Sequence, residues 1–249
     1  MHRFYLAPEN CRGDSLRLDE RESHHARHVL RLKPGDFATV LDGAGSEFLG
    51  AVENTEKKSV TLSVKEKKTT PAPPCPASLL LAIPKGKIIE DIIQKAAELG
   101  VRRIVPLLTE RVVAQLDGEG AAAKRHKWQQ VAIEAIKQCG SPWLPRVETP
   151  VALKEFLAQG GLPELTLVGS LQTKRVHPHK VLAAFSSQHG RPPHSAGLWI
   201  GPEGDFTLAE LQAIEAAGAQ PVTLGKLTLR VETAAIYGLS FLNYELQRD

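Results

Sequence analysis

The chain has little cysteine and no long apolar run. Its three cysteines, Cys11, Cys75 and Cys139, are widely spaced and form no C-x-x-C pair, which indicates neither a disulfide framework nor a zinc site. No segment approaches the roughly 18 apolar residues of a membrane span, and the first residues lack the apolar core of a signal peptide. We therefore expect a cytoplasmic protein with no membrane partner and no metal.

Aromatic residues are scarce, and neither sign of charge dominates. Aromatics make up 5% of the 249 residues and the net charge is +3, so the three tryptophans are expected in the core or at interfaces rather than stacked on bases. The proportions of 42% hydrophobic and 24% charged residues exclude a disordered or fibrous chain. The basic excess lies between residues 79 and 147, which suits contact with a phosphate backbone but also fits ordinary solvated helix faces.

Proline is concentrated in residues 69–77, Thr-Thr-Pro-Ala-Pro-Pro-Cys-Pro-Ala. Proline cannot continue a sheet ladder and favours extended geometry, so this stretch predicts a short, semi-rigid linker. We expect one domain over residues 1–70, a linker over 71–77 and a second domain over 78–249.

The pattern before the linker is typical of strands. Residues 37–41, 47–52 and 59–64 are β-branched or alternating, and Asp42-Gly43-Ala44-Gly45 places a turn between the first two. With one helix expected over 22–30, this predicts a small barrel-like β domain. On that helix His24 and His28 have the i, i+4 spacing of zinc ligands, but no third ligand completes the set, and we favour a surface or RNA-facing role for His28.

After the linker, strands alternate with helices, which predicts an α/β domain with a mostly parallel sheet. Strands are expected over 79–83, 104–108, 165–168, 198–200 and 221–224, and helices over 88–99, 128–139, 180–185, 208–217 and 233–246.

Two loops near the C-terminus each follow an expected strand and precede an expected helix, where ligands sit in open α/β sheets. The first is Ile200-Gly201-Pro202-Glu203-Gly204-Asp205-Phe206-Thr207. Pro202 lacks an N–H, and the carboxylates of Glu203 and Asp205 repel a polyanion, so a ligand with hydroxyls, amine donors or positive charge fits better than a phosphate. The alternative is an ordinary tight turn between a strand and a capped helix.

The second loop is Leu224-Gly225-Lys226-Leu227-Thr228-Leu229-Arg230-Val231-Glu232-Thr233-Ala234. A helix N-terminus carries partial positive charge, so Arg230 beside it marks a place where a developing anion is stabilised. The alternative is that Arg230 and Glu232 form an ion pair that only caps the helix.

These two loops resemble the signature of the RsmE family, ribosomal RNA methyltransferases of the knotted SPOUT superfamily. The resemblance covers nearly the whole chain through further motifs at residues 3–5, 28–31, 35–36, 42–43, 93–101, 104–107, 110–111 and 134–140. Two residues depart from the family pattern. Asp205 stands where the family usually has a second glycine, and Ser141 stands where an arginine or similar polar residue is common.

The resemblance implies an N-terminal PUA-like RNA-binding domain and a C-terminal trefoil knot, although topology rules alone predict an unknotted sheet. In that knot the loops after Val168, Ile200 and Leu224 would come together around the cofactor. The resemblance also implies an S-adenosylmethionine-dependent enzyme that methylates N3 of a uridine in 16S ribosomal RNA, and a homodimer. Arg230 would stabilise the ionised base, while Glu232 would accept its proton or hold Arg230. The expected cofactor-binding residues are Ile200, Gly201, Pro202, Glu203, Gly204, Leu224, Gly225, Leu227 and Leu229. The expected RNA-binding residues are Arg3, Arg27, His28, Arg31, Lys85, Arg111 and Gln138.

Three other functions stay open at this point. An RNA-associating assembly factor that has lost turnover would keep the same fold, with Asp205 disturbing the cofactor loop. A related enzyme would methylate a ribose 2′-OH or guanine N1. An enzyme for phosphorylated nucleotides is disfavoured because the sequence has no G-x-x-x-x-G-K-[ST] motif.

Overall fold

The protein is described by a computed structural model that covers residues 1–56, 59–112, 118–171 and 174–247. It divides into two compact units. The N-terminal unit comprises Met1–Ala72 and Ile133–Leu144, and the C-terminal unit comprises Pro73–Ala132 and Pro145–Asp249. The first division falls within the proline-rich segment, whereas the inclusion of residues 133–144 in the N-terminal unit has no signal in the sequence.

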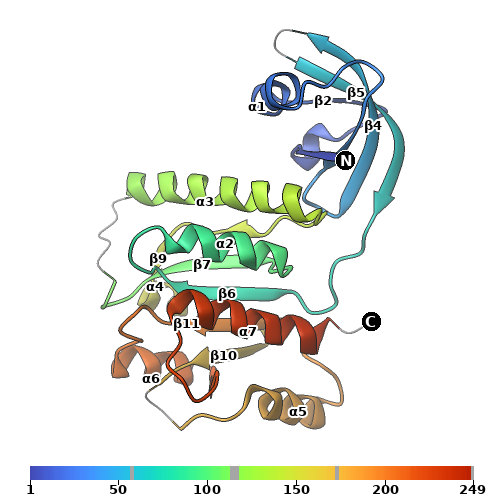
Figure 1. Cartoon of the computed structure of the whole chain (residues 1–249). Helices are drawn as coiled ribbons and strands as arrows, with labels where there is room; N and C mark the ends of the chain where they lie inside the picture. Colours follow the sequence, from blue (N-terminus) through green and yellow to red (C-terminus); the bar gives the residue numbers. More distant parts are fainter. Residues whose placement is uncertain (57–58, 113–117, 172–173, 248–249) are drawn as a thin grey trace. The chain divides into compact units, whose positions relative to one another are not determined.

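The N-terminal unit contains a five-stranded mixed sheet (Figure 1). The strands, in sheet order, are β1 (His2–Tyr5), β3 (Phe37–Leu41), β4 (Ser46–Glu56), β5 (Ser59–Thr69) and β2 (Ser15–Arg17). Only β1 and β3 pair in parallel. The three expected strands are confirmed, with β4 and β5 longer than expected, while β1 and β2 are too short to show an alternating pattern.

The helix expected over 22–30 is two successive pieces, α1 (Glu20–His24) and a π-helical turn η2 (His25–Val29). It begins earlier than expected because the Asp19 carboxylate accepts a hydrogen bond from Glu22 N at 2.8 Å and caps the first turn. Ala26 of η2 is fully buried in the core of this unit, which Phe4, Leu16 and Leu62 also build. A short 3-10 helix, η1 (Pro8–Asn10), follows β1.

Residues 133–144 join the N-terminal unit through the β3–β4 turn. Gly45 N donates to Pro142 O at 2.9 Å, and the Trp143 indole N–H donates to Pro71 O at 3.1 Å. Gly45 has φ 104°, and a Cβ there would lie 2.6 Å from the Trp143 ring. Only glycine fits this close approach.

The C-terminal unit is built on a seven-stranded sheet in which every described pairing is parallel, so the expected parallel sheet is confirmed. The order is β12-β10-β11-β6-β7-β8, with β9 also pairing with β7. The strands are β6 (Ala77–Ala82), β7 (Arg103–Leu108), β8 (Arg146–Val147), β9 (Val151–Ala152), β10 (Leu165–Gly169), β11 (Ala196–Ile200) and β12 (Gln220–Val222). The central strands β6 and β11 are buried throughout, as parallel strands covered on both faces are.

Helices connect these strands (Figure 1). They are α2 (Ile88–Glu98), α3 (Gly118–Cys139), α4 (Leu153–Gln159), α5 (Pro178–His189), α6 (Leu208–Ala216) and α7 (Val231–Leu246). The five expected helices are confirmed. The first ten residues of α3 were not predicted as helix, because two glycines at its start weaken the helical pattern. Helix α4 was not predicted because it is too short to show a helical period.

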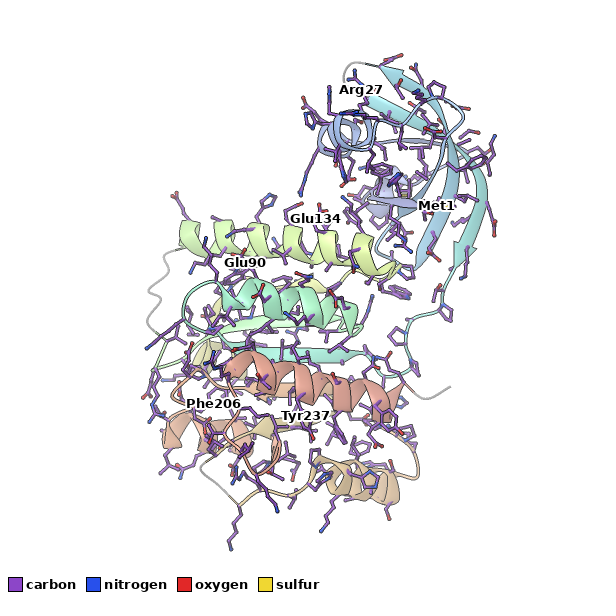
Figure 2. All side chains as sticks on the ribbon, viewed as in Figure 1. Met1, Arg27, Glu90, Glu134, Phe206 and Tyr237 are labelled. Atoms are coloured by element: carbon purple, nitrogen blue, oxygen red, sulfur yellow. The ribbon has the colours of Figure 1, made fainter. Side chains whose placement is uncertain are left out.

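The core of the C-terminal unit places the carboxyl ends of β10, β11 and β6 side by side. Trp199 and Phe206 are fully buried, and the Trp199 ring packs edge-on against Phe156 at 5.8 Å. Helix α7 contacts α2, β6 and β11, and Figure 2 shows Tyr237 on this helix. Because the strands are parallel, their following loops meet at one edge of the sheet.

Close packing between α7 and β11 depends on Gly238. A Cβ at this position would lie 2.6 Å from Leu198 Cδ2, and Leu198 is itself 1% exposed. Replacing Gly238 by alanine improves helix propensity by about 1 kcal/mol, but the clash costs about 1–3 kcal/mol in a packed core. We therefore expect a net loss of stability in denaturant unfolding. Ser240→Ala, at an exposed position of the same helix, is the matched control and is expected to cause no loss.

Candidate active site

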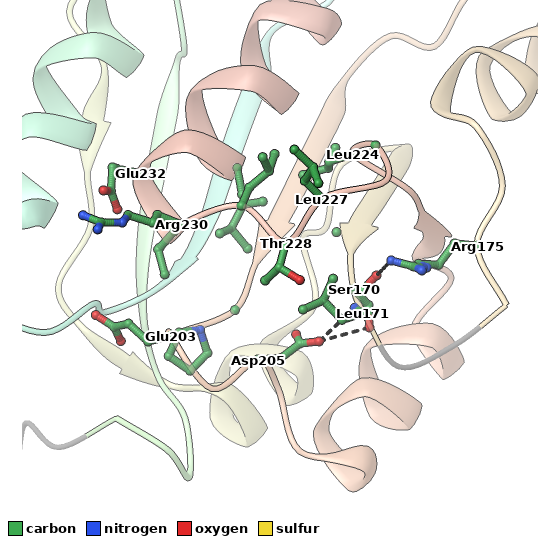
Figure 3. A pocket seen from close by; sticks show the side chains of 18 of the residues that line it. Ser170, Leu171, Arg175, Glu203, Asp205, Leu224, Leu227, Thr228, Arg230 and Glu232 are labelled. Atoms are coloured by element: carbon green, nitrogen blue, oxygen red, sulfur yellow. Dashed lines mark hydrogen bonds between the residues drawn. The ribbon is translucent and has the colours of Figure 1, made fainter.

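A cavity of about 460 Å³, here called the α7 pocket, lies at the carboxyl ends of β10 and β11 and beside the first turn of α7 (Figure 3). Both residues expected to be catalytic, Arg230 and Glu232, line it. Eight of the nine residues expected to bind the cofactor line it as well: Ile200, Gly201, Pro202, Glu203, Leu224, Gly225, Leu227 and Leu229. Gly204 does not, and its carbonyl instead accepts a hydrogen bond from Arg111.

One part of the α7 pocket is apolar. Leucines from the loop after β12 and Ile200 at the end of β11 supply its surface, and Leu227 is 79% exposed. Gly225 has φ 122°, a backbone conformation that side chains disfavour, so it allows the loop to turn. An apolar cavity of this size with a few polar groups is typical of a small-molecule site.

The other part is charged. Figure 3 shows Glu203, Arg230 and Glu232 at one end of the pocket. Arg230 is the N-cap of α7 and is exposed, and no side chain caps this helix. Within the described residues, the Arg230 side chain makes no hydrogen bond or ion pair, so the helix-capping ion pair with Glu232 is absent. An unpaired guanidinium beside a helix N-terminus is a site of positive potential.

Asp205 joins the first glycine-bearing loop, which follows β11, to the loop that follows β10. Its carboxylate accepts hydrogen bonds from Leu171 N at 3.0 Å and Ser170 Oγ at 3.4 Å, and also from Phe206 N at 2.8 Å. Asp205 has φ 60°, a left-handed conformation that fits the glycine usual in the family. The side chain therefore ties the loop after β11 to the loop after β10.

Several residues of the α7 pocket have no individual signal in the sequence. Ser170, Leu171 and Arg175 follow β10, and Arg175 donates to Ser170 O at 3.1 Å. Ile88 begins α2, and Thr228 lies within the second loop. The end of the strand expected over 165–168 marks the region of the first three, because loops after neighbouring parallel strands converge, but it does not identify the residues.

A second cavity of about 680 Å³, here called the α2 cavity, lies beside the start of α2. It brings together Lys85 and Arg111, two residues expected to bind RNA. Arg111 also donates to the carbonyls of Asp205 and Phe206, at 3.3 Å and 3.4 Å. Glu203 lines both cavities, and its carboxylate accepts a hydrogen bond from Lys85 N at 2.8 Å.

The other residues expected to bind RNA belong to the N-terminal unit. Arg27 and His28 lie in η2, and the His24 and His28 rings are 4.6 Å apart. Arg31 follows with φ 54°. Arg3 donates to the carbonyls of Lys137 and Gln138 at the end of α3, so its guanidinium has a structural role in addition to any contact with RNA.

Within the described residues no group of three or more metal-ligating side chains occurs, and no helix is long and apolar enough to cross a membrane. Burial raises the pKa of the Cys11 and Cys75 thiols to about 11. Both thiols are therefore protonated at neutral pH, which makes them poor metal ligands and poor nucleophiles.

The fold is that of an RNA methyltransferase. A family model described as an RNA methyltransferase domain matches residues 71–243, and one described as an RNA methyltransferase PUA domain matches residues 18–65. The first match covers the whole seven-stranded sheet, and the second covers most of the N-terminal sheet.

Curated relatives identify the family. The ribosomal RNA small subunit methyltransferases E of Synechocystis and Bacillus subtilis are 34% and 30% identical to this chain. The matches cover 99% and 91% of this chain and 78% and 88% of the relatives. The chain therefore belongs to the ribosomal RNA small subunit methyltransferase E family.

Solved structures agree with this assignment. A methyltransferase from Legionella pneumophila, solved with its cofactor SAM, has a TM-score of 0.84 at 33% identity and covers 98% of this chain and 97% of that one. The ribosomal RNA small subunit methyltransferase E of Neisseria gonorrhoeae, bound to S-adenosyl methionine, has a TM-score of 0.82 at 29% identity, with 98% of both chains covered.

Proposed function

We propose that this protein is an S-adenosylmethionine-dependent methyltransferase that acts on N3 of a uridine in 16S ribosomal RNA. The observation that carries the proposal is the unpaired Arg230 at the uncapped start of α7, facing a pocket with an apolar part and a carboxylate beside it. A methyl transfer to an ionised base needs both a site for the donor and a positive group for the acceptor.

The α7 pocket fits S-adenosylmethionine. Its leucines and Ile200 suit the flat adenine ring, and the carboxylates of Glu203 and Asp205 suit a ligand with amine, hydroxyl and sulfonium groups. A Cβ on Gly201 would lie 3.0 Å from Phe206 N, so the backbone is tightly folded where the ligand would approach. The bound cofactor would supply a methyl group activated by the charge on sulfur.

The residues at the charged end would act on the uridine. Uracil N3 is a poor nucleophile until it loses its proton, and the resulting anion spreads over the neighbouring carbonyl oxygens. Arg230 and the N–H groups of the first turn of α7 would stabilise that anion. Because Glu232 has no hydrogen bond to Arg230, we assign it the role of proton acceptor rather than that of holding the arginine.

The proposal is tested by mapping ribosomal RNA. Small subunits from a strain lacking the gene are expected to have lost one 3-methyluridine by mass spectrometry, and the purified protein is expected to restore it in vitro with S-adenosylmethionine. An unchanged modification profile would overturn the proposal. Loss of a 2′-O-methyl or 1-methylguanine instead would favour the related enzymes, and no binding of S-adenosylmethionine in calorimetry would favour the assembly factor.

Asp205 offers a sharper test of the cofactor site. Asp205→Gly removes the hydrogen bonds that hold Ser170 and Leu171, while the glycine tolerates φ 60°. We expect the Kd for S-adenosylmethionine to rise about tenfold, as the loss of one charge-assisted bond predicts. Asp205→Asn keeps the shape of the side chain but weakens these bonds, and should give an intermediate Kd. Equal calorimetric affinities for all three proteins would rule out this role.

We further propose a homodimer formed through the exposed face of α2 and α7. A cavity of about 470 Å³ lies between these helices, lined by Asp91 and Lys95 on α2 and by Tyr237 on α7. Tyr237 and Tyr244 are 54% and 70% exposed. A twofold interface can pair Asp91 of one copy with Lys95 of another, and Glu232 borders this groove as well as the α7 pocket.

The dimer is tested by sedimentation. Wild type is expected to have twice the chain mass of 27.1 kDa, and Tyr237→Glu is expected to dissociate because it places a charge in the apolar contact. Lys154→Ala, on the exposed face of α4, should remain dimeric. A monomeric wild type with full activity contradicts the proposal.

An enzyme acting on ribosomal RNA would work in the cytoplasm, as the sequence predicts.

A further inference from the structure

The α2 cavity concentrates positive charge beside the α7 pocket. Its basic lining side chains are Lys85, Lys87, Arg111, Lys124 and Lys127, and its acidic ones are Glu90 and Glu203. All belong to the C-terminal unit. Lys85 and Arg111 are expected from the sequence to contact RNA, and the structure places them in one cavity with three more lysines.

Most of this charge is not neutralised by the protein. Lys127 pairs with Glu90 at 2.5 Å, and Lys124 lies over the Trp128 ring at 5.8 Å. Among the described residues, the side chains of Lys85 and Lys87 have no ion pair. Within the part of the chain that the structure describes, Arg111 is bonded only to backbone carbonyls, which hold its position without neutralising its charge.

The position of Glu203 links this cavity to the site of methyl transfer. Its carboxylate bonds to the backbone of Lys85 and lines both cavities, so a ligand in the α2 cavity lies next to one in the α7 pocket. Arg111 lines the α2 cavity, and its guanidinium bonds to the loop after β11, whose residues Gly201 to Glu203 line the α7 pocket.

We propose that the α2 cavity binds the backbone phosphates next to the target nucleotide through the charges of Lys85, Lys87, Lys124 and Arg111, of which Arg111 is held in place by backbone carbonyls. This rests on the proposed function, since it names the part of the RNA that the methyltransferase holds. Extruding a stacked base costs a few kcal/mol, and phosphate contacts next to that base offset this cost where the base enters the pocket.

The test measures how RNA affinity depends on salt. Binding of a fluorescein-labelled single-stranded RNA of twelve uridines is followed by anisotropy between 50 and 300 mM KCl, with the full-length protein as wild type and as Lys85→Ala/Lys87→Ala. Each lost phosphate contact reduces the slope of log affinity against log salt by about 0.7 for a single strand. For the double variant we expect a slope about 1.4 smaller than that of the wild type, for two lost contacts, and an affinity about tenfold lower at 150 mM KCl.

Two controls separate charge from structure. Lys85→Arg/Lys87→Arg keeps the cations and should retain the wild-type slope. Lys154→Ala removes an exposed lysine from α4, outside both cavities, and should also behave as wild type. Because Lys85 and Lys87 are exposed, replacing them should not disturb the fold. The calorimetric affinity of the double alanine variant for S-adenosylmethionine is therefore expected to stay within twofold of that of the wild type.

The outcomes distinguish this inference from the proposed function. An unchanged slope and affinity in the double alanine variant overturns the phosphate site, even if the wild type methylates uridine. A reduced slope in a protein that methylates no uridine supports the phosphate site and overturns the proposed reaction.

Discussion

Arg230→Ala is expected to lower the rate of uridine methylation by about 10²–10³-fold, the effect of removing one group that stabilises an anion in a transition state. Arg230 is the N-cap of α7, and its side chain has no bond to any residue that the structure describes, so its removal leaves no described partner unpaired and should not unfold the helix. The effect should appear in the single-turnover rate with small subunits and labelled cofactor. The affinity for S-adenosylmethionine should change by less than about threefold, because the guanidinium acts on the base.

Two variants define what Arg230 contributes. Lys226→Ala removes a cation from the same loop at an exposed position outside the α7 pocket, and is expected to keep the wild-type rate. Arg230→Lys keeps the charge but not the planar group, so it should retain part of the activity. A rate for Arg230→Ala within threefold of wild type would remove this residue from the mechanism.

Local sequence signals predicted the elements that have strong periodicity or clear ends. The strand over 37–41 has the bounds of β3, and the helix over 88–99 differs from α2 by one residue. In both cases the period and the flanking glycine or turn residues act within a few positions of the chain. The parallel sheet followed from the alternation of strands and helices.

The site was predictable to the extent that it is local. Each glycine-bearing loop is one continuous segment, the second contains Arg230 and Glu232, and the structure brings residues of both loops into one pocket. The resemblance implied that the loop after Val168 meets the other two, but Ser170 and Arg175 were not named, because a single sequence does not reveal which residues of that loop line the pocket. Asp205 was noted for its charge and as a departure from a glycine, but its bond to Leu171 N was not predictable because it spans 34 positions.

The assignment of residues 133–144 to the N-terminal unit was also beyond the sequence. Lys137 looks like one more surface cation of a helix, yet it is 8% exposed, and Glu22 is 4% exposed. The Lys137 ammonium contacts Glu22 Oε1 at 2.7 Å and Glu134 Oε2 at 3.1 Å. These contacts fasten the end of α3 to α1 within the N-terminal unit.

Lys137→Met is therefore expected to destabilise the N-terminal unit by about 3–5 kcal/mol, the cost of leaving a buried charge without its partner. Burial raises the pKa of Glu22, whereas the hydrogen bond and charge of Lys137 lower it, so without Lys137 the carboxyl should be neutral over a wider pH range. Hydrogen exchange measured by mass spectrometry over β3, β4 and β5 reports this unit separately from the rest of the chain.

The matching double variant distinguishes a lost partner from lost packing. In Lys137→Met/Glu22→Leu no charge is left buried, and apolar replacements of buried ion pairs are often neutral or stabilising. We expect exchange in β3–β5 to return to near the wild-type rate. If the single variant exchanges as slowly as wild type, the pair contributes nothing to stability. If the double variant exchanges as fast as the single one, an unpaired Glu22 carboxylate is not the cause of the lost stability.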